Sequence, residues 1–380
     1  MDRTLKMARF AVLTAFFING AVIATWVSRI PAVQQKLSLS EAELGVVLLG
    51  TAVGVLVALS MAGGLVARLG STRVLLTAGI AMCALLVPLA LVNSPVVLWL
   101  NLFASGAAIS TMDVSMNDQA AAVERLAKRP LMSSFHATYS IGGLVGALFG
   151  AGMAALPGMT LELHFLVVAV LLALVLLFST RYLLPAQPSG DESPVFRLPE
   201  RALWLLGAAA FCSSIGEGAM ADWSGVYLSR VLATTAATAA LGYAAFSLTM
   251  TVGRLLGDAI LSRWPADGVV RVGGGLAALG LLMIVGTKAT AAALVGFGLV
   301  GLGLANIVPV TFSAAGNYPG IIPSAGIASV ATIGYAGFLA GPPVIGVVAE
   351  ETSLRISFIL VALAVGSLVY TARGVRKTDG

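Results

Sequence analysis

The chain has 380 residues, of which 58% are hydrophobic and only 10% are charged. Ordinary globular domains carry about 25% charged residues, so this composition excludes a soluble globular protein and indicates an integral membrane protein. The net charge of +5 fits the bias of membrane proteins for Lys and Arg on one side, and we expect no nucleic-acid partner.

Apolar runs of about twenty residues recur along the chain, and each is long enough to cross a hydrocarbon core about 30 Å thick as a helix. The first run follows a basic segment, as in a cleaved signal peptide, but it is too long for one and continues into similar runs. The predicted spans are 9–30, 44–66, 74–92, 96–117, 133–156, 163–183, 202–223, 239–260, 271–287, 289–310, 325–347 and 356–372. We therefore predict an all-α polytopic membrane protein with twelve transmembrane helices.

The distribution of basic residues predicts the orientation. Most Lys and Arg residues lie in the termini and in the connections that share a side with the N-terminus, as Arg73 and Arg125 do. Short cytoplasmic loops retain Lys and Arg, so both termini are expected in the cytoplasm. The expected location is the cell membrane, either a bacterial inner membrane or a plasma membrane, which the chain crosses several times.

The longest polar interruption, 185–201, is rich in Pro and charge and follows the sixth span. It predicts an N-terminal bundle over 1–184, a cytoplasmic linker and a C-terminal bundle over 202–380. The halves also share fragments in the same order, such as "NGAVIATW" (19–26) and "GEGAMADW" (216–223). Paired six-helix halves are the architecture of alternating-access carriers, so we expect two pseudo-symmetric six-helix bundles in a monomer.

Two loop sequences resemble signatures of the major facilitator superfamily. "GGLVARLGSTR" (63–73) resembles the pattern G-x-x-x-D-R-x-G-R-R between helices 2 and 3, although Ala67 occupies the acidic position. "GRLLGDAILSR" (253–263) resembles the corresponding signature of the second half and keeps its carboxylate, Asp258. The resemblance covers the whole chain and implies that helices 1, 4, 7 and 10 line a central cavity.

Within that superfamily, "TMDVSMN" (111–117), "FSLTMTVGRLLGD" (246–258) and "GYAGFLAGPPVIG" (334–346) resemble the YbjJ-type carriers, which are distantly similar to fucose:proton symporters. The superfamily resemblance also implies a conformational latch, formed here by Arg68 and by Asp258 with Arg254. Arg254 and Asp258 are four residues apart, so a plain ion pair on one helix is the alternative.

Few ionisable residues fall inside the predicted spans, and each is a candidate for function because a charge there is costly. Asp113 and His136 lie equally far from the middle of the connection between their helices, so we expect them at a similar depth. Asn117 shares the Asp113 face and Tyr139 the His136 face. The pair is predicted to couple proton movement to transport, and a static pair between two helices is the alternative.

Further polar and aromatic residues predict a solute site, because carboxylates, amides and aromatic faces together suit a polyol or sugar. The tryptophans could instead be interfacial anchors. The predicted substrate-binding residues are Asn19, Trp26, Asn117, Tyr139, Glu217, Trp223, Asn306 and Tyr335.

Other classes fit the sequence less well. The chain has only two His residues and no HExxH metal site, and it has no phosphate-binding loop. We therefore expect that it is not an enzyme and that it binds no metal and no cofactor. The proton is the expected coupling ion. A sensor would commonly carry long soluble extensions. The prediction is a secondary transporter, either a proton symporter of a small polar solute such as a sugar or polyol, or a proton-antiport exporter of amphipathic compounds.

Overall fold

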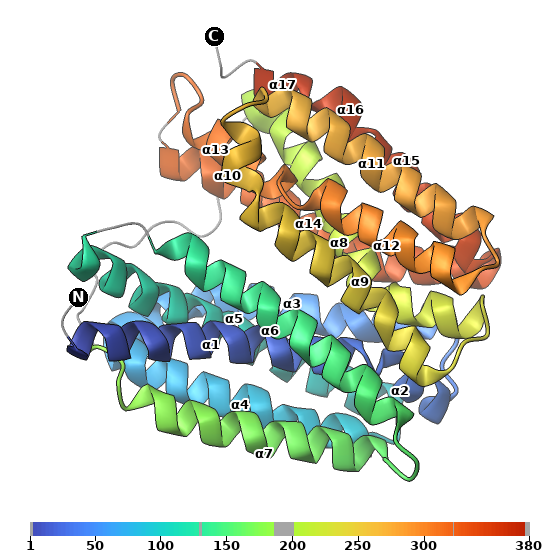
Figure 1. Cartoon of the computed structure of the whole chain (residues 1–380), viewed down its shortest axis with the longest axis horizontal. Coiled ribbons are helices and arrows are strands. Elements are labelled where there is room, and N and C mark those ends of the chain that lie inside the picture. The colour runs from blue at the N-terminus through green and yellow to red at the C-terminus, as the bar shows by residue number, and fades with distance from the viewer. Residues whose placement is uncertain (1–2, 129–130, 186–200, 322, 377–380) are drawn as a thin grey trace. The chain divides into compact units, whose positions relative to one another are not determined.

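The computed structural model describes residues 3–128, 131–185, 201–321 and 323–376, and every regular element in these ranges is a helix (Figure 1). Twelve helical segments in this part of the chain are long and apolar enough to cross a membrane. The predicted all-α architecture with twelve spans is therefore confirmed. The helices are α1 (Arg3–Val27), α2 (Ile30–Leu37), α3 (Glu41–Leu69), α4 (Ser71–Leu91), α5 (Pro95–Ala127), α6 (Met132–Ala155), α7 (Leu161–Thr180), the short 3-10 helix η1 (Arg201–Leu203), α8 (Trp204–Arg230), α9 (Ala236–Leu255), α10 (Gly257–Leu261), α11 (Ala266–Gly286), α12 (Thr290–Leu304), α13 (Ile307–Gly316), α14 (Pro323–Glu351), α15 (Leu354–Gly366), α16 (Leu368–Thr371) and α17 (Arg373–Arg376).

Some of the segments that are long enough to cross a membrane are divided into two or more helices. The tenth span, Thr290–Gly316, consists of α12 and α13, which are separated at Ala305 and Asn306. The predicted eighth span continued to residue 260, whereas α9 ends at Leu255 and the short α10 follows after Leu256. An interrupted helix frees backbone carbonyl groups, which must find other donors in the absence of water.

The chain divides into two compact units. The first unit comprises Met1–Ser38 and Val47–Glu192, and the second comprises Leu39–Val46 and Ser193–Gly380. The predicted linker, 185–201, falls largely outside the described residues.

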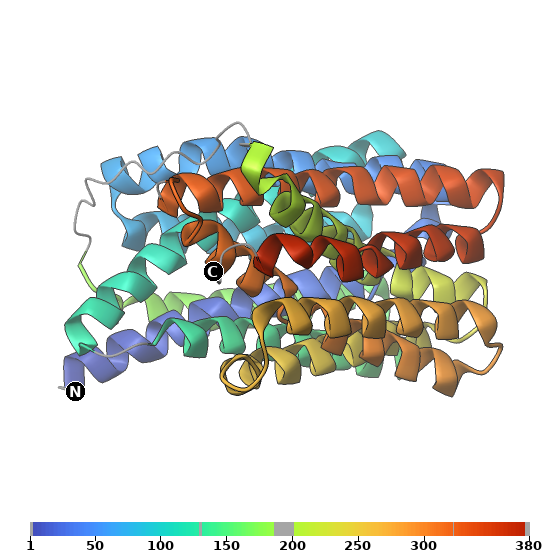
Figure 2. The ribbon, with the colours of Figure 1, turned by 90° about the horizontal axis from the view of Figure 1, so that it is seen from above.

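In the first unit, α6 runs along α1, and α4 packs against α5 and α7 (Figures 1 and 2). Glycines allow the α1–α6 approach, because a Cβ atom at Gly20 would meet the carbonyl oxygen of Tyr139 and one at Gly142 would meet that of Phe17. Small residues let helix backbones come close where lipid offers no hydrophobic force between helices. Backbone contact therefore fixes how α1 and α6 lie against each other.

The second unit uses the same kind of packing. Its main helix pairs are α8 with α14, α11 with α12, and α9 with α12. Gly303 of α12 abuts the carbonyl oxygen of Gly273 on α11, and Gly301 abuts that of Phe246 on α9. Since α12 is held closely on two sides, the break that follows it is held in a defined position.

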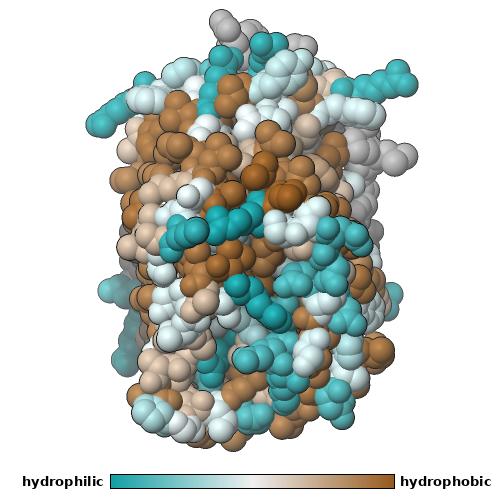
Figure 3. Space-filling view, turned by 90° about the vertical axis from the view of Figure 1, so that its right-hand side faces the viewer, coloured by the Kyte–Doolittle hydropathy of each residue, from teal (hydrophilic) through white to brown (hydrophobic). Residues whose placement is uncertain are grey.

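Large hydrophobic side chains are exposed along the helices. Examples from four helices are Leu100, Leu171, Leu279 and Leu363. Figure 3, which views the right-hand side of Figure 1, shows hydrophilic patches between hydrophobic ones. Apolar side chains pointing away from the packed interior suit contact with hydrocarbon.

The α1–α6 contact predicts a difference between two glycines of α6. We expect Gly142→Ala to destabilise the first unit by about 1–3 kcal/mol, because its methyl group would press against the carbonyl oxygen of Phe17. Gly152→Ala is the matched control, since a Cβ atom there meets nothing within 4 Å. Melting temperatures in detergent measure both, and equal values would contradict the close contact.

Candidate functional site

An ion pair joins two membrane-length helices of the second unit. Glu217 lies on α8 and Arg254 lies near the end of α9, and Nη2 of Arg254 is 3.4 Å from Oε2 of Glu217. Ser213, one turn before Glu217, donates a hydrogen bond to Oε1 at 3.4 Å. The Glu217 side chain is only 18% exposed and that of Arg254 34%. Both carboxylate oxygens thus have partners, one on the same helix and one on the next.

This partner differs from the one that spacing along the chain suggested. The four-residue spacing suggests an ion pair of Arg254 with Asp258 as one alternative, whereas in the structure the Arg254 guanidinium donates to Glu217. An i,i+4 pair needs one continuous helix, whereas α9 ends at Leu255 and Asp258 belongs to α10. The side chain of Asp258 lies outside the described residues, so the Arg254–Asp258 pair and the latch stay predictions.

Asn306 holds the end of the helix that carries Arg254. Its side chain is buried in the break between α12 and α13, and Nδ2 donates to the carbonyl oxygen of Gly253 at 3.1 Å. Gly257 leaves room for the amide, because a Cβ atom there would collide with Oδ1 of Asn306. In this conformation the Asn306 amide binds backbone, and a role in substrate binding stays a prediction.

The two other predicted residues of the second unit differ in exposure. Trp223 is fully buried in α8, and its Nε1 atom has no hydrogen-bond partner among the described residues. Tyr335 on α14 is 37% exposed. Stacking of a substrate on Trp223 would require its neighbours to move apart, and both roles stay predictions.

In the first unit, Asp113 and Asn117 form a polar turn on α5. Nδ2 of Asn117 donates to the backbone carbonyl of Asp113 at 2.9 Å and to its Oδ1 at 3.3 Å. The Asp113 side chain is exposed on the helix surface, and it has no ion-pair partner among the described residues. A carboxylate on a membrane-length helix is thus held by a neutral amide.

His136 lies on α6 with a different neighbour. Its ring meets that of Phe16 edge-on, with the centroids 5.2 Å apart. Helix α6 packs along α1 much more than along α5. The equal distance of Asp113 and His136 from the connection between α5 and α6 could predict their depth but not this difference in packing. The predicted pairing of Asp113 with His136 stays a prediction.

Asn19, Trp26 and Tyr139 lie at the α1–α6 contact or close to it. Asn19 and Trp26 are buried in α1, and Nδ2 of Asn19 has no hydrogen-bond partner in the described part of the chain. The backbone carbonyl of Tyr139 faces Gly20. In this conformation Asn19 and Trp26 belong to the packed interior of the first unit, whereas Tyr139 is half-buried. Their binding roles stay predictions.

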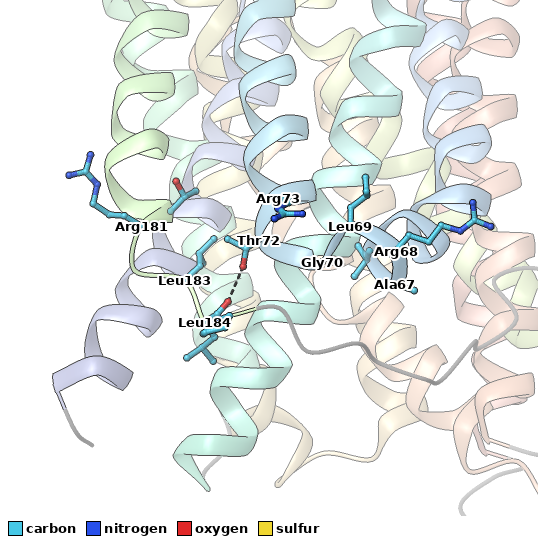
Figure 4. A pocket seen from close by; sticks show the side chains of 12 residues that line it. Ala67, Arg68, Leu69, Gly70, Thr72, Arg73, Arg181, Leu183 and Leu184 are labelled. Atoms are coloured by element: carbon cyan, nitrogen blue, oxygen red, sulfur yellow. Dashed lines mark hydrogen bonds between the residues drawn. The ribbon is translucent and has the colours of Figure 1, made fainter.

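The predicted latch residue Arg68 is exposed near the end of α3, where it lines a pocket with Arg73 and Arg181 (Figure 4). The described residues contain no group of three or more His, Cys, Asp or Glu side chains placed to hold a metal ion.

Twelve membrane-length helical segments within the described ranges, in two compact units with an ion pair between helices of one unit, are typical of polytopic membrane transporters. Within that class, the family model of the Major Facilitator Superfamily matches residues 10–323. The chain belongs to this superfamily and is a secondary transporter embedded in a membrane by multiple spans.

Relatives with similar sequences have nearly the same length. The chain is 37% identical to an uncharacterized MFS-type transporter of Yersinia pestis, over 96% of this chain and 94% of the relative. It is 34% identical to the membrane protein MosC of Rhizobium meliloti, over 97% and 89% of the two chains. The first relative is described as a transporter and the second as a membrane protein, and neither description names a solute.

Solved structures show the same fold. A mutant of the nucleoside transporter NupG superposes with a TM-score of 0.79 at 14% identity, covering 97% of this chain and 99% of NupG. A bacterial homolog of the human lysosomal transporter Spinster gives 0.72 at 16% identity, over 100% and 98% of the chains. The subgroup resemblance to YbjJ-type and fucose carriers stays a prediction.

A double-mutant cycle tests the ion pair. We expect Glu217→Gln and Arg254→Gln to show a coupling energy of at least about 1 kcal/mol, because the two groups join separate helices. The control pair is Asp267 with Arg271, 3.0 Å apart on one helix, for which about 0.3–0.5 kcal/mol is expected. Unfolding in detergent measures both cycles, and equal coupling energies would contradict a role in joining helices.

Removing the Asn306 amide should destabilise the second unit. Asn306→Ala leaves the carbonyl oxygen of Gly253 without its side-chain donor, a loss of about 1–3 kcal/mol for a buried group. Asn317→Ala is the control, because this exposed amide only donates to Ser313 within its own helix, and its loss should stay within about 0.5 kcal/mol. Melting temperatures compare them, and a smaller effect at Asn306 would refute the assignment.

Proposed function

We propose that this chain is a proton-coupled symporter that imports a small polar solute such as a sugar or polyol by alternating access. The Glu217–Arg254 ion pair carries the proposal. A charge near the bilayer centre costs about 2.5–3.5 kcal/mol on insertion scales, and ionisable residues there commonly mark ion or substrate pathways. A carboxylate and a guanidinium that meet between two helices are suited to that role.

The pair supplies a way to couple a proton to a solute. When Glu217 is ionised, its charge holds Arg254. When a proton binds to the Glu217 carboxylate, the charge attraction disappears, and the carboxyl and guanidinium groups become available to hydroxyl groups of a solute. Release of the proton on the other side re-forms the ion pair and expels the solute.

The first unit supplies a second candidate proton site. Asp113 accepts a hydrogen bond from the neutral Asn117 amide, so protonation changes its charge without breaking an ion pair among the described residues. In the proposed cycle Asp113 exchanges protons with His136 as its partner. The amide of Asn117 and the hydroxyl of Tyr139 would add donors and acceptors for a polar solute.

The alternative is proton-antiport export of amphipathic compounds. The exposed Asp113 carboxylate favours it, because a carboxylate without a described cationic partner can bind a cationic compound and release it on protonation. The orientation proposed from Lys and Arg places both termini in the cytoplasm, so import means movement toward the side of the termini. Direction of flux separates the two functions.

Uptake into proteoliposomes tests the proposal. Labelled sugars and polyols should accumulate when the outside is more acidic, and accumulation should stop when the pH gradient is collapsed. We expect Glu217→Gln to abolish accumulation but to keep exchange of labelled for unlabelled solute, because exchange needs no net proton movement. Asp113→Asn is assayed in the same way.

Controls separate coupling from folding. Glu351→Gln removes an exposed carboxylate at the end of α14 and should leave accumulation unchanged. Glu217→Gln combined with Arg254→Gln removes both charges and should remain folded yet uncoupled. Unchanged proton-driven accumulation in both Glu217→Gln and Asp113→Asn would refute the proposal, and gradient-driven dye efflux without sugar uptake would establish the exporter.

A further inference from the structure

A pocket of about 600 Å³ lies in the first unit where α3 ends and α4 begins. The segment after α7 forms its other side, and Figure 4 shows the side chains of both walls. The lining is Val66, Ala67, Arg68, Leu69, Gly70, Thr72, Arg73, Thr180, Arg181, Leu183, Leu184 and Pro185. Three helices that cross the membrane thus end around one hollow.

The pocket carries positive charge without a described counter-charge. Its lining includes three arginines and no acidic residue. Arg68, Arg73 and Arg181 form no ion pair among the described residues, and the Arg181 guanidinium lies 4.9 Å from the centroid of the Phe178 ring. In Figure 4, Arg73 lies between the other two, whose guanidinium groups point away from it in opposite directions. Such a set favours an anion.

Hydrogen bonds fix one wall of the pocket. Gln119 of α5 is almost completely buried, and it both donates to the carbonyl oxygen of Leu184 and accepts from its amide, each at 3.1 Å. Nε2 of Gln119 also donates to Oγ of Ser71 at 2.9 Å. The hydroxyl of Thr72 donates to the Leu184 carbonyl oxygen at 2.8 Å (Figure 4). The segment after α7 is therefore tied to the start of α4.

The start of α4 adds to the attraction. Gly70 precedes the helix with a φ of 83°, and no side chain caps the first turn. The first backbone N–H groups of a helix have no partner within it and carry partial positive charge, which favours an anion beside them. Arg73 and the uncapped turn thus act on the same region.

We propose that this pocket binds a phosphoryl group, supplied by an anionic phospholipid headgroup or by a soluble phosphate compound. The Arg73 guanidinium can donate to two phosphate oxygens at the start of α4, while Arg68 and Arg181 add positive charge from farther away. Basic pockets between membrane helices on the cytoplasmic side suit anionic headgroups. Leu69, Leu183 and Pro185 provide apolar lining beside the arginines. Because the spans end here, the pocket lies at headgroup depth, with hydrocarbon next to it.

Lipid binding to the full chain tests the proposal. The wild type is placed in nanodiscs of phosphatidylcholine with increasing phosphatidylglycerol, and retained lipids are counted by native mass spectrometry. Replacing Arg68, Arg73 and Arg181 with Gln should weaken phosphatidylglycerol binding at least about tenfold, since each basic residue near the surface contributes about 1 kcal/mol. The charge-matched control replaces Arg125, Arg263 and Arg373, three exposed arginines outside the pocket.

A second variant keeps every arginine. Ala67→Asp introduces a carboxylate into the pocket lining, and it should weaken phosphatidylglycerol binding at least about tenfold by supplying the missing counter-charge. This variant keeps the proposal testable if the triple variant does not fold. Gly63→Asp places the same new charge on α3 where a Cβ atom meets nothing within 4 Å and outside the pocket lining, and it should bind as the wild type does.

Inorganic phosphate and pyrophosphate distinguish the sources. The ligand is a soluble phosphate compound if these anions raise the melting temperature of the wild type but not of Ala67→Asp, and if the two proteins retain the same amount of phosphatidylglycerol. Equal weakening by the pocket and control triple variants would show unspecific attraction and overturn the site. Retention of full phosphatidylglycerol and phosphate binding by Ala67→Asp would also overturn it.

Discussion

Hydrocarbon offers no hydrogen bonds, and this constraint decides where polar groups of this chain can lie. Glu217 meets Arg254 and Ser213, and the carbonyl freed near the end of α9 meets Asn306. Each of these polar side chains is satisfied by a residue on another helix or one turn away. The same constraint makes the Glu217–Arg254 and Asn306–Gly253 contacts ties between helices, so polar residues help to define the interior of the second unit together with apolar packing.

Backbone contact supplies the second kind of tie. Glycines bring α6 onto α1 and α12 onto both α9 and α11, at distances that a methyl group would prevent. Without a hydrophobic force between helices in lipid, such contacts depend on close van der Waals packing. The break at Asn306 follows the tightly held α12, so the ends of α9 and α12 are fixed together, and Arg254 is fixed with them.

Sequence alone predicted the spans well because length and apolar composition determine a membrane helix almost completely. The predicted span 74–92 corresponds to α4, Ser71–Leu91. Partner choice was not predictable in the same way: residue spacing identifies which side chains share a face of one helix, but not which helix lies beside it. The contact of Arg254 with Glu217 was therefore not predicted, and the use of Asn306 as a backbone ligand was missed.

A transport cycle needs ties that hold and can also be released. An ion pair of low exposure gains Coulomb energy but loses hydration, and the two terms largely cancel, so its net strength is modest although loss of one partner is costly. Protonation of a carboxylate changes that balance without moving any backbone. The glycine contacts have no such control, because no proton or solute alters them. Within the second unit, the Glu217–Arg254 pair is thus the kind of contact that a proton can switch, whereas the helix packing around it provides the rigid body that the switch would move.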